Sequence, residues 1–138
     1  MSVKTALATR LTLDAGVSAL VGFRVYPVAL PQNAPRPAIT YQRMPSGHDQ
    51  TLTKASGTSL GVFRIRSFGD KYSEADQVAE AVRQALQAFS GTVDGTTINA
   101  VVLTNDFDEF FQPQDASDQG VFCVTFDFHV RYAESIPV

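Results

Sequence analysis

Hydrophobic residues recur along the chain at two spacings, and the spacing of three to four residues predicts helices. In residues 3–13, the apolar side chains of Val3, Leu7 and Leu11 return every four residues, which is typical of one face of an amphipathic helix. We expect this helix to end near residues 14–16, where a glycine can adopt a left-handed cap. The first element is therefore predicted to be a helix that buries one stripe of side chains.

A second long helix is predicted for residues 73–89. Ser73 precedes Asp76 by three residues, which is a common helix start, and apolar residues follow at helical spacing. A shorter helical turn is expected at residues 17–20. The longer segment has the stronger pattern and is expected to be the main helix of the fold.

Alternation of apolar and polar residues predicts strands in the remainder of the chain. The pattern is clearest in residues 121–132, where Phe122, Val124, Phe126 and Phe128 alternate with polar residues, so this face must be buried. Three further strands are predicted at residues 38–44, 60–68 and 97–105, and a short edge strand is expected at residues 24–28.

This order of elements, helix, strand, strand, helix, strand, strand, predicts an α+β fold. We expect a single-domain two-layer sandwich, in which an approximately four-stranded, largely antiparallel sheet is packed by two main helices and carries long protruding loops. The length of 138 residues and a hydrophobic content of 44% suit one domain spanning residues 1–138. Such a core needs no metal or disulfide, and Cys123 is the only cysteine.

Two polar segments between the predicted strands are candidate interfaces. Residues 45–59 are rich in Ser, Thr, Gly, Asp and Gln, which indicates either a disordered tip or an arm that orders against a neighbouring subunit. Residues 106–120 are predicted to form an acidic loop with three phenylalanines, which either fold back on the core or are covered by another chain. The candidate interface residues are His48, Asp49, Gln50, Lys54, Phe107, Asp108, Glu109, Phe110, Phe111 and Asp115.

The sequence contains no recognisable catalytic constellation. Cys123 and His129 lie six residues apart on one strand face, about 20 Å at roughly 3.3 Å per residue, which is too far for a dyad. The acidic residues at 106, 108 and 109 lack the remainder of a calcium loop, and no glycine cluster suits a phosphate. We therefore predict no catalytic residue, no metal site and no cofactor.

The charge distribution limits the partners that are expected. Eleven Lys and Arg against 14 Asp and Glu give a net charge of −3, and the basic residues are scattered, so tight binding to a phosphate backbone is not expected. No apolar run approaches the roughly 20 residues that cross a bilayer, and no secretion signal follows Met1, so no membrane is expected. The single cysteine favours synthesis in a reducing cytoplasm.

The first third of the chain resembles a known family. Its motifs are Val17-Ser18-Ala19-Leu20-Val21-Gly22, Arg24-Val25-Tyr26-Pro27, Pro31-Gln32 and Pro37-Ala38-Ile39-Thr40-Tyr41. This run resembles the tail-completion proteins of long-tailed bacteriophages, which are also described as tail terminators or tail-to-head joining proteins. The later elements lie where that family would have them, so the resemblance covers nearly the whole chain.

The resemblance implies a structural virion protein and not an enzyme. It implies a ring, typically of six identical subunits, that caps the head-proximal end of the tail tube, ends tail polymerisation and joins the tail to the connector or neck of the head. The expected partners are other copies of the chain, the tail tube protein and the connector or neck proteins. Assembly in the host cytoplasm is expected, and DNA is expected to pass through the lumen without specific binding, past acidic residues such as Asp108 and Asp115.

Two other readings of the sequence stay open. Another tail-tube or neck connector subunit would share the size and the predicted α+β core. A small bacterial α+β binding domain or enzyme is the alternative outside the virion, and it would need a concave pocket with convergent polar groups.

Overall fold

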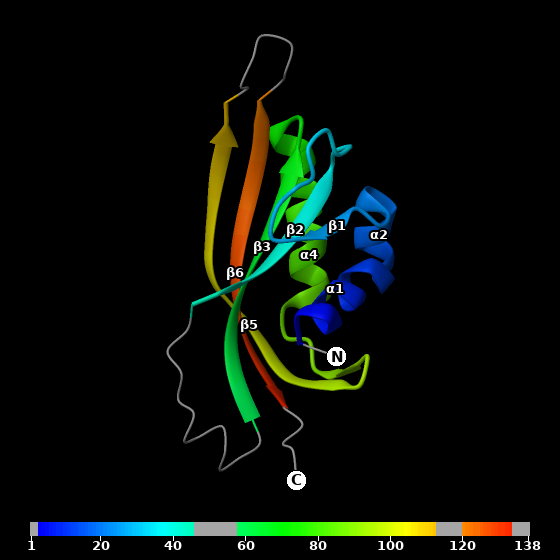
Figure 1. Cartoon of the computed structure of the whole chain (residues 1–138), viewed down its shortest axis with the longest axis vertical. Helices are drawn as coiled ribbons and strands as arrows, with labels where there is room; N and C mark the ends of the chain where they lie inside the picture. Colours follow the sequence, from blue (N-terminus) through cyan, green and yellow to red (C-terminus); the bar gives the residue numbers. More distant parts are fainter. Residues whose placement is uncertain (1–2, 46–57, 113–119, 134–138) are drawn as a thin grey trace.

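The computed structural model describes residues 3–45, 58–112 and 120–133, which form a curled mixed sheet with helices on one side (Figure 1). Within these residues the sheet has six strands in the order β1-β2-β3-β6-β5-β4. The strands are β1 (Val25–Pro27), β2 (Ala38–Met44), β3 (Thr58–Gly69), β4 (Gly91–Val93), β5 (Thr96–Phe111) and β6 (Val121–Ala133). The helices are α1 (Val3–Leu13), α2 (Ala15–Val21) and α4 (Tyr72–Leu86).

This architecture corrects the predicted four-stranded sheet with two main helices, although the α+β class holds. The short edge strand expected at residues 24–28 forms as β1 and extends the sheet beside β2. β4 was not predicted, because its three residues are too few to show an alternating pattern. β1 pairs with β2 in parallel, whereas the other neighbouring strands are antiparallel, so the sheet is mixed. α2 is a full helix where the sequence predicted only a short turn.

The central pair of strands, β3 and β6, supplies the centre of the core. Phe63 lies opposite Phe128 and Ile65 lies opposite Phe126, and these side chains are buried under the helices. The even positions of β6 therefore face the core, as the alternation predicted. The apolar face of α4 packs on them through residues that include Val78, Val82 and Leu86.

The helix boundaries differ from the prediction at two caps. Asp14 was expected to lie at the end of α1, but its side chain caps the start of α2 by accepting a hydrogen bond from Val17 N at 3.0 Å. The left-handed residue is instead Gly22, after α2, with φ of 61°. Ser73 does not cap α4, because the helix begins at Tyr72 and its N-cap, Lys71, makes no side-chain cap bond.

The largest correction concerns the acidic segment that was expected to be a loop. β5 does not end at residue 105 but continues to Phe111 and pairs with β6 along residues 105–111. Irregular register between Leu103 and Asn105 marks a bulge in this strand. The sequence predicted a loop because the segment has little apolar alternation, yet pairing with the strongly alternating β6 holds it extended.

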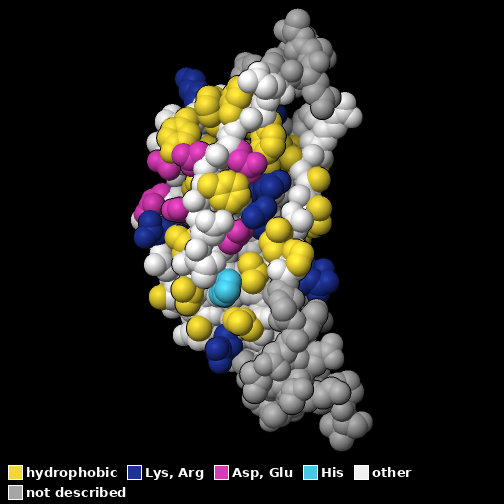
Figure 2. Space-filling model, turned by 90° about the vertical axis from the view of Figure 1, so that its left-hand side faces the viewer, with side chains coloured by type: hydrophobic (Ala, Val, Ile, Leu, Met, Phe, Trp, Pro, Cys, Tyr) yellow, Lys and Arg dark blue, Asp and Glu magenta, His cyan; other side chains and the backbone are white. Residues whose placement is uncertain are grey.

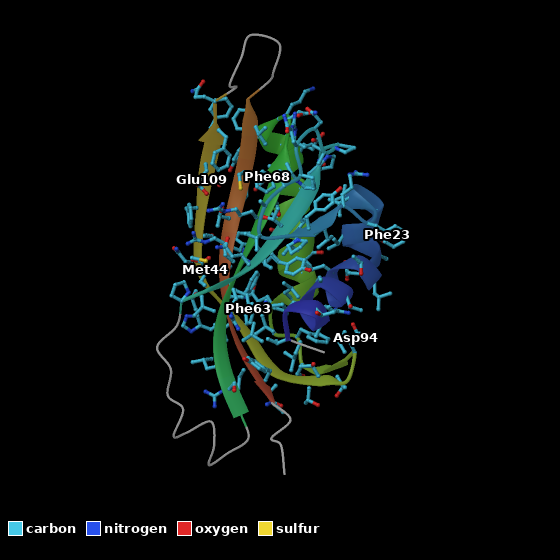
Figure 3. All side chains as sticks on the ribbon, viewed as in Figure 1. Phe23, Met44, Phe63, Phe68, Asp94 and Glu109 are labelled. Atoms are coloured by element: carbon cyan, nitrogen blue, oxygen red, sulfur yellow. The ribbon has the colours of Figure 1, made fainter. Side chains whose placement is uncertain are left out.

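At its other end, β5 curves beneath the helices and turns back into β4 (Figure 1). An Asp-Gly turn forms there, with positive φ at Asp94 and Gly95. The Asp94 side chain accepts a hydrogen bond from Thr9 of α1, which ties this turn to the first helix (Figure 3). No helix of the described chain is long and apolar enough to cross a bilayer.

Candidate functional site

The sheet face turned away from the helices carries most of the described candidate residues. Pairing with β6 places Phe107, Glu109 and Phe111 on this outer face, opposite Thr125, Cys123 and Val121. Figure 2 shows the face from the side of β5 and β6, with acidic and basic side chains among hydrophobic ones. No helix of the described residues covers this face, and the described side chains on it belong to strands.

An ion pair lies at the centre of the outer face. Arg64 of β3 donates to both carboxylate oxygens of Asp127 of β6, at 2.8 Å and 3.1 Å. The Arg64 guanidinium also lies 5.2 Å from the ring centre of Phe107. The pairing holds the pKa of Asp127 below its usual range and raises that of Arg64, so both groups are charged at neutral pH.

A second, looser group of polar residues lies beside this pair. Arg66 of β3 reaches Glu109 of β5 at 3.9 Å, and Thr125 donates to the same carboxylate at 3.1 Å. Glu109 therefore links β5 to two strands across the face (Figure 3). Because Arg64 and Arg66 are both paired with carboxylates, they do not form a free positive surface.

Aromatic side chains lie at the end of the sheet where β5 stops and β6 starts. Phe111 contacts Phe68 on the outer face, with ring centres 6.3 Å apart. On the opposite face, the ring centres of Phe110 and Phe122 are 4.8 Å apart. The ring of Tyr72, at the start of α4, also contacts Phe122, with its centre 6.3 Å from that of Phe122. The Phe110 and Phe111 side chains are 45% and 40% exposed, so each is only half covered by its own chain.

Asp108 lies on the helix side of β5 and accepts a hydrogen bond from the Tyr72 hydroxyl at 3.0 Å. This bond raises the pKa of Tyr72, because the neutral phenol is the donor. It also connects the end of β5 to the first turn of α4. Asp108 is thus an exposed acid with one fixed partner.

The described part of the chain brings together no catalytic constellation. Cys123 is buried, and burial raises the pKa of its thiol to about 11, so the thiol is protonated at neutral pH. His129 lies six residues further along β6. Glu109 faces away from Asp106 and Asp108, and no three metal-ligating side chains cluster among the described residues.

Comparison with known proteins identifies the family. The family described as "Tail completion protein gp17" matches residues 5–133, which is nearly the whole chain. The chain belongs to this tail completion family. The protein is therefore a structural component of the bacteriophage tail and is located in the virion. No curated protein sequence matches the chain.

Solved structures show the same fold. A chain described as "Virion of native gene transfer agent (GTA) particle" is 20% identical, with a TM-score of 0.70 and 96% of each chain covered. A second solved chain is 18% identical, with a TM-score of 0.52, and the match covers 99% of this protein and 96% of that chain. At these identities the likeness shows the fold alone.

Several predicted site residues lie outside the described ranges. These are His48, Asp49, Gln50, Lys54 and Asp115. Phe107, Asp108, Glu109, Phe110 and Phe111 are described, but the strand distributes them over both faces instead of gathering them in one loop.

Sequence reasoning missed the partners on the neighbouring strands. The sequence pattern did not single out Arg64, Arg66 or Asp127, whereas the structure pairs Arg64 with Asp127 and leaves Asp127 only 8% exposed. The available signal was that all three occupy polar positions of long strands. Without the strand order, nothing showed that β3 and β6 are neighbours.

Proposed function

We propose that the protein caps the head-proximal end of the tail tube as one subunit of a ring, ends tail polymerisation and joins the tail to the connector or neck of the head. Membership of the tail completion family, over residues 5–133, is the observation that carries this proposal. A ring of six copies is the simplest form, with the tail tube protein and the neck proteins as its other partners.

The charges of the described residues suit a passage that DNA crosses without being held. The net charge is −3, and the paired Arg64 and Arg66 do not present a concentrated basic surface. An exposed acid such as Asp108 would repel passing phosphates if it faced the bore. We accordingly propose a lumen that binds no specific DNA sequence, and a protein that is not an enzyme.

Phe110 and Phe111 are the proposed contact residues for neighbouring proteins in the tail. Each ring is half exposed although it stacks on another ring of its own chain. Half-exposed aromatic residues are frequent anchors of protein interfaces, because a partner can bury the remainder of a side chain that is already ordered.

Removal of the protein from a strain that produces the complete phage particle tests the proposal. Without the chain, electron microscopy should show tails of uncontrolled and excessive length that are not attached to heads, and supplying the wild-type chain should restore normal tails. Tails of normal length that join heads in its absence would refute a terminating role.

Two matched variants extend this experiment. A Phe111→Ala chain should fail to restore head-joined tails while melting within a few degrees of the wild type, since its ring is partly exposed. Phe23→Ala, which removes an 87% exposed ring near α2, should restore them (Figure 3). Equal restoration by both variants would exclude Phe111 as an anchor.

A further inference from the structure

The sheet has an open edge along most of β5. β4 pairs with β5 only over Thr96–Ile98. A little further along β5, the backbone N–H of Ala88 donates a hydrogen bond to the carbonyl oxygen of Val101. Residues 102–111 have β6 on one side and, among the described residues, no strand on the other. At roughly 3.3 Å per residue this open edge is about 33 Å long, which is enough to accept another strand.

A second open edge lies at the opposite side of the sheet, beside β2. β1 pairs with β2 only as far as Tyr41, because Pro27 has no N–H and the chain then turns away at Val28, which has φ of 65°. Residues 42–44 of β2 are left without a strand on that side in the described chain. A groove of about 380 Å³ occupies this position and is lined by residues that include Lys4, Val28, Gln42 and Arg43.

The two edges carry opposite charge. The open part of β5 contains Asp106, Asp108 and Glu109 and no basic residue. The groove beside β2 is flanked by Lys4 and Arg43, and neither forms an ion pair with another described residue. Pairing two β5 edges would bring like charges together, whereas pairing β5 with the groove beside β2 brings opposite charges together.

The strand directions permit this second pairing. β2, β3, β6 and β5 alternate in direction, so β5 runs opposite to β2 within one chain. A neighbouring copy turned about an axis along the strands keeps these directions, and its β2 would then lie antiparallel to β5. The contact uses two different patches of each subunit, so it repeats by rotation and can close into a ring.

We infer that the open edge of β5, centred on Asp106, binds the groove beside β2, flanked by Lys4 and Arg43, of a second copy of this chain. The inference rests on the proposed ring and deepens it by naming the contact between subunits. The sheets of neighbouring copies then continue into one another, which satisfies backbone groups that the described residues of each copy leave open.

Charge reversal at Asp106 and Arg43 tests the contact, because both side chains are exposed and neither has a described ion pair. Asp106→Arg alone places two positive charges opposite each other at every contact, because the new Arg meets Arg43 of the neighbouring copy. Arg43→Glu alone places two negative charges opposite each other, because the new Glu meets Asp106. Each variant should lose assembly by about tenfold or more in dissociation constant. An equimolar mixture restores an opposite pair at every contact of an alternating ring, so the mixture should regain the wild-type mass.

Light scattering after size exclusion measures these masses over a wide concentration range at low and physiological salt. The matched controls Glu80→Arg on α4 and Arg131→Glu on β6 reverse exposed charges elsewhere and should assemble like the wild type. Reversed variants that assemble normally, a mixture that does not recover, or a wild type that is monomeric throughout would each overturn the inference.

Disulfide formation gives a second readout that does not depend on charge. Met44→Cys in one preparation and Asn105→Cys in another should cross-link under mild oxidation when mixed, because the antiparallel pairing that places Arg43 opposite Asp106 places Met44 opposite Asn105. Cys123 should stay unreactive because it is buried. A full-mass ring without this cross-link refutes the contact and leaves the tail-capping proposal standing. Conversely, a confirmed contact in a protein whose removal leaves tails normal would refute the capping proposal alone.

Discussion

Asp127 shows how a polar strand position becomes part of the structure of this protein. Its carboxylate accepts two bonds from Arg64 and a third from Asn105 Nδ2 at 3.3 Å, and the residue is only 8% exposed. A carboxylate removed from water to this extent requires such partners, because an unpaired buried charge is strongly destabilising. The three bonds join β3, β6 and β5 on the outer face.

Asp127→Asn should lower the free energy of unfolding by about 2 kcal/mol at pH 7, since it removes a charged acceptor from a half-buried arginine. Because folding lowers the pKa of Asp127 from its ordinary value of 3.8, the stabilisation is complete above that value and is lost as the pH falls through the lowered pKa. Urea unfolding of the variant and wild type should therefore differ at pH 7 and converge in acid. Asp76→Asn, which changes an exposed acid of α4, is the control and should change stability by less than about 0.5 kcal/mol.

Cys123 is predicted to be an inert thiol. Burial raises its pKa to about 11, so the native protein should react very slowly with a thiol reagent at pH 8 and react fully once unfolded in urea. Because the folded pKa is raised, the stability that the neutral thiol contributes is present below pH 9 and is lost as the pH rises towards 11. Rapid labelling of the native protein at pH 8 would show that the residue is accessible.

At the scale of elements, the sequence indicated α1, α4, β3 and β6 because each is long enough to show a clear period. The prolines around residues 24–28 also indicated the short edge strand that forms as β1. The same reasoning failed for β4, whose three residues carry no period, and for the acidic end of β5. That end is a strand because β6 pairs with it, which is a non-local cause that a local pattern does not contain. The placement of Phe107 and Glu109 on one face followed from this pairing and was not predictable before it.

The two helix caps give a test at this scale. Asp14→Ala should destabilise the protein by about 1 kcal/mol, because it removes the acceptor for Val17 N at the start of α2. Ser73→Ala should change stability by less than about 0.5 kcal/mol, although Ser73 looks like a cap in the sequence, because α4 begins one residue earlier. Thermal melts of both variants measure this, and a larger loss for Ser73→Ala would contradict the helix boundary.

At the scale of the whole molecule, the family and its place in the virion were predictable, whereas the sheet was not. The motifs around Gly22 and Pro37 indicated the tail completion family, and the match over residues 5–133 confirms it. The number of strands and their mixed directions depend on which segments meet in space, so they required the structure. The open edges of β2 and β5 became visible only with the strand order.

The position of the protein on the tail tests the central proposal most directly. Intact particles carrying a peptide tag after Val138 would be labelled with gold-conjugated antibody and viewed by electron microscopy. We predict gold at one point, where the tail meets the head, and at one end only of tails that have not yet joined heads. Gold distributed along the whole tail would instead identify a tube subunit, and gold confined to the distal tip would contradict a role at the head-proximal end.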